Sequence, residues 1–168
     1  MHMNSVSSSS ADARTVGEIR VKGATVTRGY WQNPEATAAA FDAQGFLRTG
    51  DLATIDEHGY VDIVDRKKDV IKTGGEAVYS VEVENVLYAH PAVLECAVYG
   101  MPDSMWGERV TAAVVLRPGC AATMQELISF CRDRIAHYKA PKEVRFLTAL
   151  PRTGSGKITK KALRESAG

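Results

Sequence analysis

The stretch DRKKDVIKTGGE, residues 65–76, separates two kinds of sequence pattern. Before it, residues 17–23 alternate charged and apolar side chains between glycines, which predicts a half-buried strand. Runs at 46–55 and 60–64 flank a turn that ends in glycine, and this arrangement predicts a hairpin. After it, strand-like runs alternate with helical ones. We therefore expect a domain boundary near residues 66–68.

Helix signals occur on both sides of this boundary. Asn33 can cap a short helix over residues 34–41, because proline is tolerated at the first helical position. Ser80 is expected to cap a second helix, whose apolar residues follow i, i+3, i+4 spacing. Thr123 and Glu126 form a capping-box pattern, which predicts the start of a third helix.

Further strand-like runs follow in the second half of the chain, at residues 94–99, 110–116 and 144–147. A short basic helix is expected after Thr159. The mixture predicts an α+β domain over residues 68–168, a small sheet flanked by helices, preceded by a β-hairpin region at 14–67. Residues 1–13 carry a serine run without an apolar stretch, so we interpret them as a linker or an expression remnant, not a signal peptide.

Composition excludes several classes of protein. The chain has 168 residues, 45% of them hydrophobic, which is enough for a real core, and its net charge of +1 favours neither nucleic acid nor a membrane surface. No apolar run approaches the roughly 20 residues needed to span a bilayer. The three cysteines, Cys96, Cys120 and Cys131, form no CxxC pair, which argues against a disulfide framework and against a zinc site. A reducing cytoplasm fits this cysteine usage.

Several motifs occur in one order along the chain. They are GYW at 29–31, NPEAT at 33–37, FLRTGD at 46–51, DRKKDVIKTGGE at 65–76 and PRTGSGKI at 151–158. Together they resemble the later motifs of the adenylate-forming (AMP-binding) superfamily. The resemblance implies the C-terminal part of a fatty-acyl or aryl acyl-CoA ligase. Residues 14–67 would then be the end of the large N-terminal lobe, and residues 68–168 the C-terminal lid domain.

The resemblance assigns nucleotide contacts to the first half. Asp51 matches the family aspartate that binds the ribose hydroxyls, and a turn-forming aspartate is its alternative. Arg66 matches the arginine that reaches the ribose or a phosphate. A surface ion pair with Asp65 or Asp69 is the alternative for Arg66. Lys68 stands at the family hinge, about which the lid swings between the adenylating and thioester-forming arrangements.

The resemblance also assigns roles in the lid. Lys157 matches the catalytic lysine, whose ammonium would stabilise charge on the acyl carboxylate and the α-phosphate. Its alternative is a flexible surface lysine. Gly74 and Gly75 match the loop that lines the pantetheine tunnel, where an ordinary tight turn is the alternative. Trp106 and Tyr138 match rings that some members present to the CoA nucleotide, although both could instead pack against their own domain.

The sequence departs from the family pattern in places. The early phosphate loop and the acyl pocket are missing, so we expect this chain alone to be inactive. Asp65 replaces a common glycine, Ala77 replaces an asparagine common in CoA ligases, and Ala140 stands where some members carry a basic residue. Neither of the first two changes removes an expected contact.

The implied parent enzyme converts a carboxylic acid, ATP and CoA into acyl-CoA, AMP and pyrophosphate, with Mg²⁺ held by the ATP phosphates and no metal ligand set in this chain. An adenylating enzyme that delivers to a carrier-protein arm is the runner-up, and a free-standing binding module is a second alternative. A nucleic-acid binder is a third. It rests only on a basic cluster that we expect to be solvated, Lys157, Lys160, Lys161 and Arg164. Glu82 and Glu84 are likewise expected to be solvated.

Overall fold

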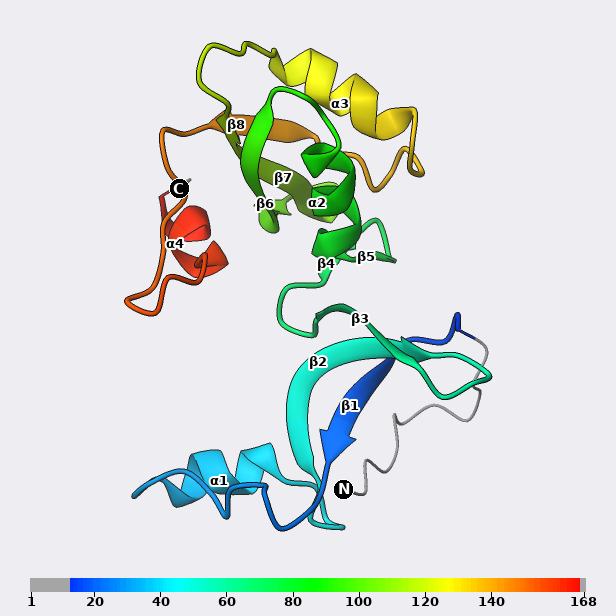
Figure 1. Ribbon diagram of the computed structural model, residues 1–168, viewed down its shortest axis with the longest axis vertical. Coiled ribbons are helices and arrows are strands. Elements are labelled where there is room, and N and C mark those ends of the chain that lie inside the picture. The colour runs from blue at the N-terminus through cyan, green and yellow to red at the C-terminus, as the bar shows by residue number, and fades with distance from the viewer. Residues whose placement is uncertain (1–12, 167–168) are drawn as a thin grey trace. The chain divides into compact units, whose positions relative to one another are not determined.

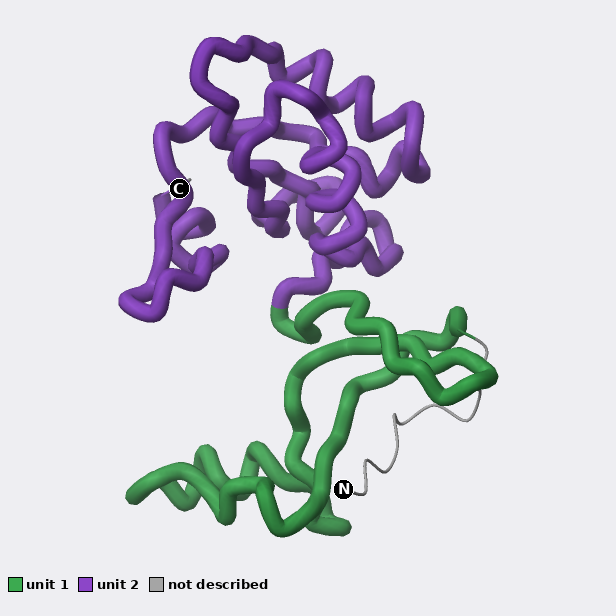
Figure 2. The backbone as a smooth tube through the Cα atoms, in the orientation of Figure 1, with its two compact units in different colours: residues 1–68 green, residues 69–168 purple. Residues whose placement is uncertain are grey.

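A computed structural model describes residues 13–166 of the chain. The expected linker at residues 1–13 lies outside the described residues except for Ala13. The backbone divides into two compact units, residues 1–68 and 69–168, which Figure 2 shows in two colours. Each unit is built around its own sheet (Figure 1). No helix within residues 13–166 has the length and apolar character needed to cross a bilayer.

Unit 1 is a three-stranded antiparallel sheet with one helix. Its elements are β1 (Gly17–Val21), α1 (Pro34–Ala40), β2 (Leu47–Ile55) and β3 (Val61–Arg66). β2 is the central strand and pairs with β1 and β3. The predicted cap is confirmed, since Asn33 Oδ1 accepts a hydrogen bond of 2.9 Å from the amide of Ala36. The predicted hairpin is also present, as β2 and β3.

The described residues of unit 2, 69–166, form five strands and three helices. They are β4 (Ile71–Thr73), β5 (Glu76–Val78), α2 (Ser80–Tyr88), β6 (Val93–Asp103), β7 (Gly107–Leu116), α3 (Met124–Arg132), β8 (Glu143–Phe146) and α4 (Lys160–Glu165). The strand order is β5-β4-β7-β6, and β8 adds parallel to β7. This confirms the predicted α+β fold with a small sheet flanked by helices.

The sheet of unit 2 buries both of its faces. Along β6, Cys96 and Val98 belong to one core cluster, whereas Ala97 and Tyr99 belong to another. This alternation is what a strand period of two requires. The first cluster lies beneath α2 and α3, and the second cluster includes Leu163 of α4. The segment before α4 is therefore attached to the second face of the sheet.

Two of the local expectations were wrong in detail. Ser80 does not cap α2: Tyr79 is the N-cap residue, and Ser80 is the first helical residue with its hydroxyl bound to Lys160. Strands β6 and β7 are longer than the sequence indicated, because their pairing continues through residues 100–103 and 107–109. The capping box of α3 is confirmed, with Thr123 and Glu126 bonded reciprocally. The backbone amide of Thr123 lowers the pKa of Glu126.

Candidate functional site

Asp51 and Arg66 lie opposite each other on β2 and β3. Arg66 Nε donates to Asp51 Oδ1 across 3.0 Å. The Asp51 side chain is 29% exposed and that of Arg66 is 56% exposed. The guanidinium thus pairs with Asp51 instead of the expected alternatives, and Asp69 pairs with Arg164 at 3.5 Å. The antiparallel register brings together two residues that are 15 positions apart.

This pair leaves binding capacity unused. Asp51 Oδ2 and the two terminal nitrogens of Arg66 make no hydrogen bond within residues 13–166. A carboxylate oxygen accepts hydrogen bonds from hydroxyl groups, and the guanidinium donates to phosphate or hydroxyl oxygens. The pair can therefore hold a diol and an adjacent anion where the middle of β2 meets the end of β3.

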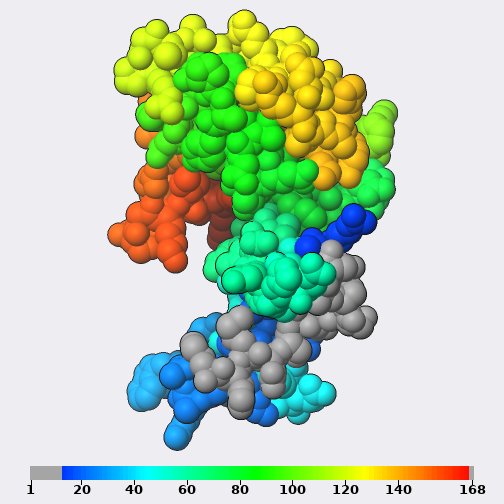
Figure 3. Space-filling view, turned by 45° about the vertical axis from the view of Figure 1, so that its right-hand side comes forward, coloured from blue at the N-terminus to red at the C-terminus, as the bar shows by residue number. Residues whose placement is uncertain are grey.

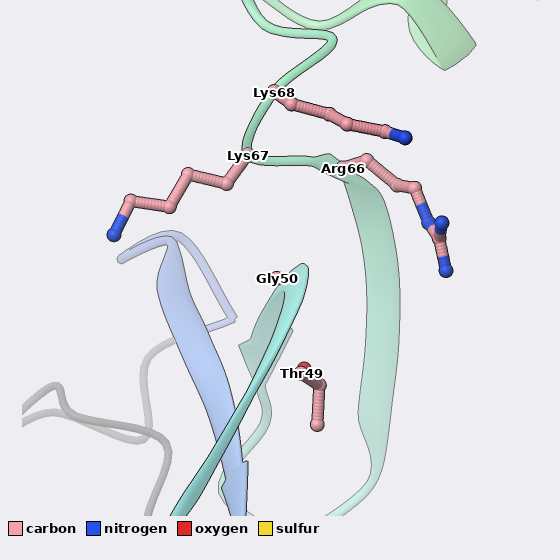
Figure 4. Close-up of a pocket in the computed structure, with 5 residues that line it drawn as sticks. All are labelled: Thr49, Gly50, Arg66, Lys67 and Lys68. Carbon is pink, nitrogen blue, oxygen red and sulfur yellow. The ribbon is translucent and has the colours of Figure 1, made fainter. Parts of the chain in front are cut away.

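A pocket of about 420 Å³ opens beside this pair and is lined by Thr49, Gly50, Arg66, Lys67 and Lys68 (Figure 4). In Figure 4, the Arg66 and Lys68 side chains extend to one side of the chain and Lys67 to the other. Lys67 Nζ pairs with Glu18 Oε2 at 3.1 Å. Arg66 and Lys67 are each paired with a carboxylate, so Lys68 is the lining cation without an ion pair within residues 13–166, and its charge favours an anionic ligand.

Lys157 lies in a closed hairpin between β8 and α4. An isolated bridge pairs Arg152 with Ile158, and the amide of Thr153 donates to the Lys157 carbonyl at 2.8 Å. The Lys157 amide donates to Thr153 Oγ1 at 3.2 Å. In the space-filling view the orange segment that contains this hairpin stands out from the rest of unit 2 (Figure 3). The backbone around Lys157 is therefore a hydrogen-bonded hairpin.

The Lys157 side chain is exposed and has no hydrogen bond or ion pair within the described part of the chain. Its neighbours in the basic cluster differ. Lys160 Nζ contacts Glu84 Oε1 at 2.8 Å and Ser80 Oγ at 2.6 Å, with both charged side chains about 15% exposed. The expectation that Lys160 and Glu84 are solvated was wrong, because α4 packs against β6 and α2.

The glycine pair and Trp106 meet at one edge of the unit 2 sheet. Gly74 and Gly75 have φ angles of +59° and +84°, which residues with a β-carbon rarely adopt. The Gly74 amide donates to the Trp106 carbonyl at 2.9 Å, and a β-carbon at Gly74 would lie 3.0 Å from the indole. Trp106 remains 48% exposed, so part of its ring can still stack on a ligand.

Tyr138 lies on a different loop, between α3 and β8, and is 41% exposed. Lys139 Nζ lies 6.0 Å from its ring centroid and binds Glu82 at 2.7 Å. The Lys139 ammonium beside this ring is therefore already paired. Glu82, which we expected to be solvated, holds it.

The structure also adds residues that the sequence did not indicate. Arg152 pairs with Glu95 of β6 and donates to the Gly156 carbonyl. No local pattern marks this contact, since the two side chains are 57 positions apart. The described residues contain no group of three or more His, Cys, Asp or Glu side chains that could hold a metal ion.

Comparisons with known proteins identify relatives of this chain. The family model of the AMP-binding enzyme C-terminal domain matches residues 82–157. Feruloyl-CoA synthase from Amycolatopsis sp. is 49% identical over 152 residues, covering 90% of this chain. Peroxisomal benzoate–CoA ligase from Arabidopsis thaliana is 45% identical over 167 residues, covering 93% of this chain. The crystal structure of ATP-bound MatB from Rhodopseudomonas palustris superimposes with a TM-score of 0.86 at 43% identity over 91% of this chain.

The matched region is only part of each relative. This chain spans 31% of the length of the feruloyl-CoA synthase, 29% of the benzoate–CoA ligase and 30% of the MatB chain. The similarity therefore covers most of this chain but less than a third of each relative.

Proposed function

Because this chain belongs to the adenylate-forming superfamily, with an AMP-binding enzyme C-terminal domain at residues 82–157, we propose that it is the C-terminal portion of an acyl-CoA ligase. The whole enzyme would convert a fatty or aryl carboxylic acid, ATP and CoA into acyl-CoA, AMP and pyrophosphate. One observation carries this proposal: the Lys157 ammonium group has no ion pair within residues 13–166, and its backbone is held by hydrogen bonds.

Lys157 would act electrostatically in the first half-reaction. When the carboxylate attacks the α-phosphorus, negative charge develops on the phosphoryl oxygens and on the departing pyrophosphate. An ammonium group placed beside those oxygens stabilises the transition state more than the ground state. The side chain is available for this role because its charge is not neutralised by another residue within the described part of the chain.

Asp51 and Arg66 would hold the nucleotide during this step. The free oxygen of Asp51 accepts from a ribose hydroxyl, and the terminal nitrogens of Arg66 donate to the ribose or a phosphate. The cationic pocket beside them suits the remaining negative charge. Mg²⁺ would be bound through the ATP phosphates, where it neutralises charge on the leaving pyrophosphate.

Lys68 would serve as the hinge between the half-reactions. It is the last residue of unit 1 and is exposed, so its backbone can rotate without breaking a packed core. In the second half-reaction, Gly74 and Gly75 would leave room for the pantetheine arm. Trp106 and Tyr138 would present their exposed rings to the CoA nucleotide.

CoA is the proposed acceptor, and the names of the two ligases above support it over a carrier-protein arm. We assign the reaction to the cytoplasm, since Cys96, Cys120 and Cys131 are all free thiols. The name of the Arabidopsis relative includes a peroxisomal location, so a fluorescent fusion would decide between these compartments.

A direct test uses the full-length protein and a panel of fatty and aryl acids. We expect pyrophosphate exchange into ATP that depends on one class of acid, followed by transfer to CoA but not to a phosphopantetheinyl carrier protein. The 168-residue chain alone should show no turnover, because it lacks the phosphate loop of the large lobe. No exchange with any acid in the panel, or a full-length protein with the boundaries of this chain, would favour the free-standing binding module.

A further inference from the structure

We propose that Arg152 is a positioning residue for Lys157, acting as a brace between the hairpin and β6. The inference rests on the adenylation role proposed for Lys157. Arg152 has a different role from Lys157, because its guanidinium would act on the hairpin backbone and not on the substrate. Its partner in the sheet is Glu95 of β6.

Arg152 contacts the peptide bond that precedes Lys157. Arg152 Nη1 donates to the Gly156 carbonyl oxygen at 2.8 Å, and that carbonyl belongs to the peptide bond joining Gly156 to Lys157. On the other side of the same peptide, the Lys157 amide donates to Thr153 Oγ1. Both polar groups of this peptide are therefore engaged, which fixes the direction in which the Lys157 side chain leaves the backbone.

The second terminal nitrogen of Arg152 connects the hairpin to the sheet. Arg152 Nη2 forms an ion pair with Glu95, and Glu95 is held by its strand, whose neighbours Cys96 and Ala97 are buried. One planar guanidinium thus contacts the sheet and the hairpin backbone at the same time. A lysine ammonium cannot reproduce this fork, because its three donors sit on one nitrogen atom.

The ion pair between Arg152 and Glu95 should contribute little to the stability of unit 2. A loss of Arg152 can therefore affect the position of Lys157 without unfolding the unit. The Arg152 side chain is 42% exposed and Glu95 is 33% exposed, and such pairs contribute about 0–1 kcal/mol to folding. The base of the hairpin has its own support, since Leu150 and Leu163 are buried and Ile158 packs against the same cluster. Loss of Arg152 should therefore loosen the hairpin tip while unit 2 stays folded.

The test uses the full-length enzyme with Arg152→Ala and Arg152→Lys. The rate of acyl-adenylate formation at saturating ATP is measured separately from thioester formation from supplied acyl-adenylate. A misplacement of about 1 Å costs on the order of 100-fold in rate, so we expect Arg152→Ala to slow adenylation about 10-fold to 100-fold. The KM for ATP and the thioester step should change less than about threefold. Arg152→Lys should fall between Arg152→Ala and wild type, because it keeps only one of the two contacts.

Arg109 supplies a matched control. Arg109 pairs with Glu143 at 3.0 Å, and its Nη1 donates to the Pro102 carbonyl oxygen at 3.0 Å. The Arg109 side chain is 33% exposed and the Glu143 side chain is 37% exposed. These contacts repeat the chemistry of Arg152 away from the hairpin. Arg109→Ala should therefore leave the adenylation rate unchanged.

A second comparison separates this inference from the proposed function. In a Lys157→Ala background, Arg152→Ala should cause no further loss of adenylation, because Arg152 acts only through Lys157. Wild-type adenylation in Arg152→Ala, or equal losses in both half-reactions, would overturn the brace while leaving the role of Lys157 intact. Unchanged adenylation in Lys157→Ala would overturn the role of Lys157 and the brace together.

Discussion

Replacing Lys160 by methionine should destabilise unit 2 strongly, because Lys160 holds α4 against the sheet. Its ammonium contacts Glu84 Oε1 at 2.8 Å and Ser80 Oγ at 2.6 Å. Glu84 Oε1 also accepts from the Val98 amide of β6 at 2.8 Å. One side chain of α4 is thus bound to α2 directly and to β6 through Glu84.

The expected magnitude follows from burial. The side chains of Lys160 and Glu84 are 15% and 16% exposed, so the substitution leaves a shielded carboxylate with one backbone donor. Breaking a fully buried pair costs about 3–5 kcal/mol. Because water still reaches part of Glu84, we expect a loss of about 2–3 kcal/mol in the free energy of unfolding, which lowers the Tm of a domain of this size by about 10–20 °C.

Urea unfolding of the chain, followed by Trp106 fluorescence in a Trp31→Phe background, measures this loss. Trp31 is 88% exposed in unit 1, so its removal isolates the signal of unit 2. Lys161→Met is the control, since Lys161 is 83% exposed and lies 3.7 Å from its partner Glu165. It should change stability by less than about 0.5 kcal/mol.

A double-mutant cycle with Glu84→Gln tests whether Lys160 and Glu84 are energetically coupled. A glutamine retains an acceptor for Val98 without leaving a buried charge, so Glu84→Gln combined with Lys160→Met should be more stable than the sum of the single changes predicts. The coupling should exceed about 1 kcal/mol. Equal effects of Lys160→Met and Lys161→Met on stability, or perfect additivity in the cycle, would refute the stabilising role of the pair between Lys160 and Glu84.

Other expectations concern the nucleotide contact and the thiols. In the full-length protein, Asp51→Ala should weaken ATP binding about tenfold, equivalent to about 1.4 kcal/mol. The control Asp62→Ala, on the exposed side of β3, should leave ATP binding unchanged. Equal effects of the two substitutions in a binding titration would argue against the ribose contact. Burial raises the pKa of Cys96 to about 12 and that of Cys131 to about 11, so both thiols stay protonated at neutral pH. A thiol reagent at pH 8 should therefore label the exposed Cys120 quickly and the other two only after denaturation, and rapid labelling of three thiols in the native chain would contradict the burial.

Local signals in the sequence predicted local structure well. The asparagine cap of α1, the capping box of α3 and the hairpin of β2 and β3 each depend on residues a few positions apart. Family resemblance indicated Asp51 and Arg66, and the antiparallel register explains why the two meet. The resemblance could not indicate that Asp51 and Arg66 bind each other, because this contact depends on the direction of the two side chains in the folded sheet.

Contacts between distant segments could not be predicted from the sequence. Lys160 and Ser80 are 80 positions apart, and Arg152 and Glu95 are 57 apart. Such pairs form only once α4 and the hairpin pack on the second face of the sheet. For the same reason the local pattern predicts a cap at Ser80, whereas the Ser80 hydroxyl accepts a hydrogen bond from Lys160 near the end of the chain.

The most direct test of the central claim is the effect of Lys157→Ala on the two half-reactions of the full-length enzyme. Removing one preorganised electrostatic contact typically costs about 100-fold to 1,000-fold in rate. We predict a loss of this size in carboxylate-dependent pyrophosphate exchange, with thioester formation from supplied acyl-adenylate close to wild type. Pyrophosphate exchange at the wild-type rate in Lys157→Ala would contradict the claim that this hairpin carries the adenylation chemistry.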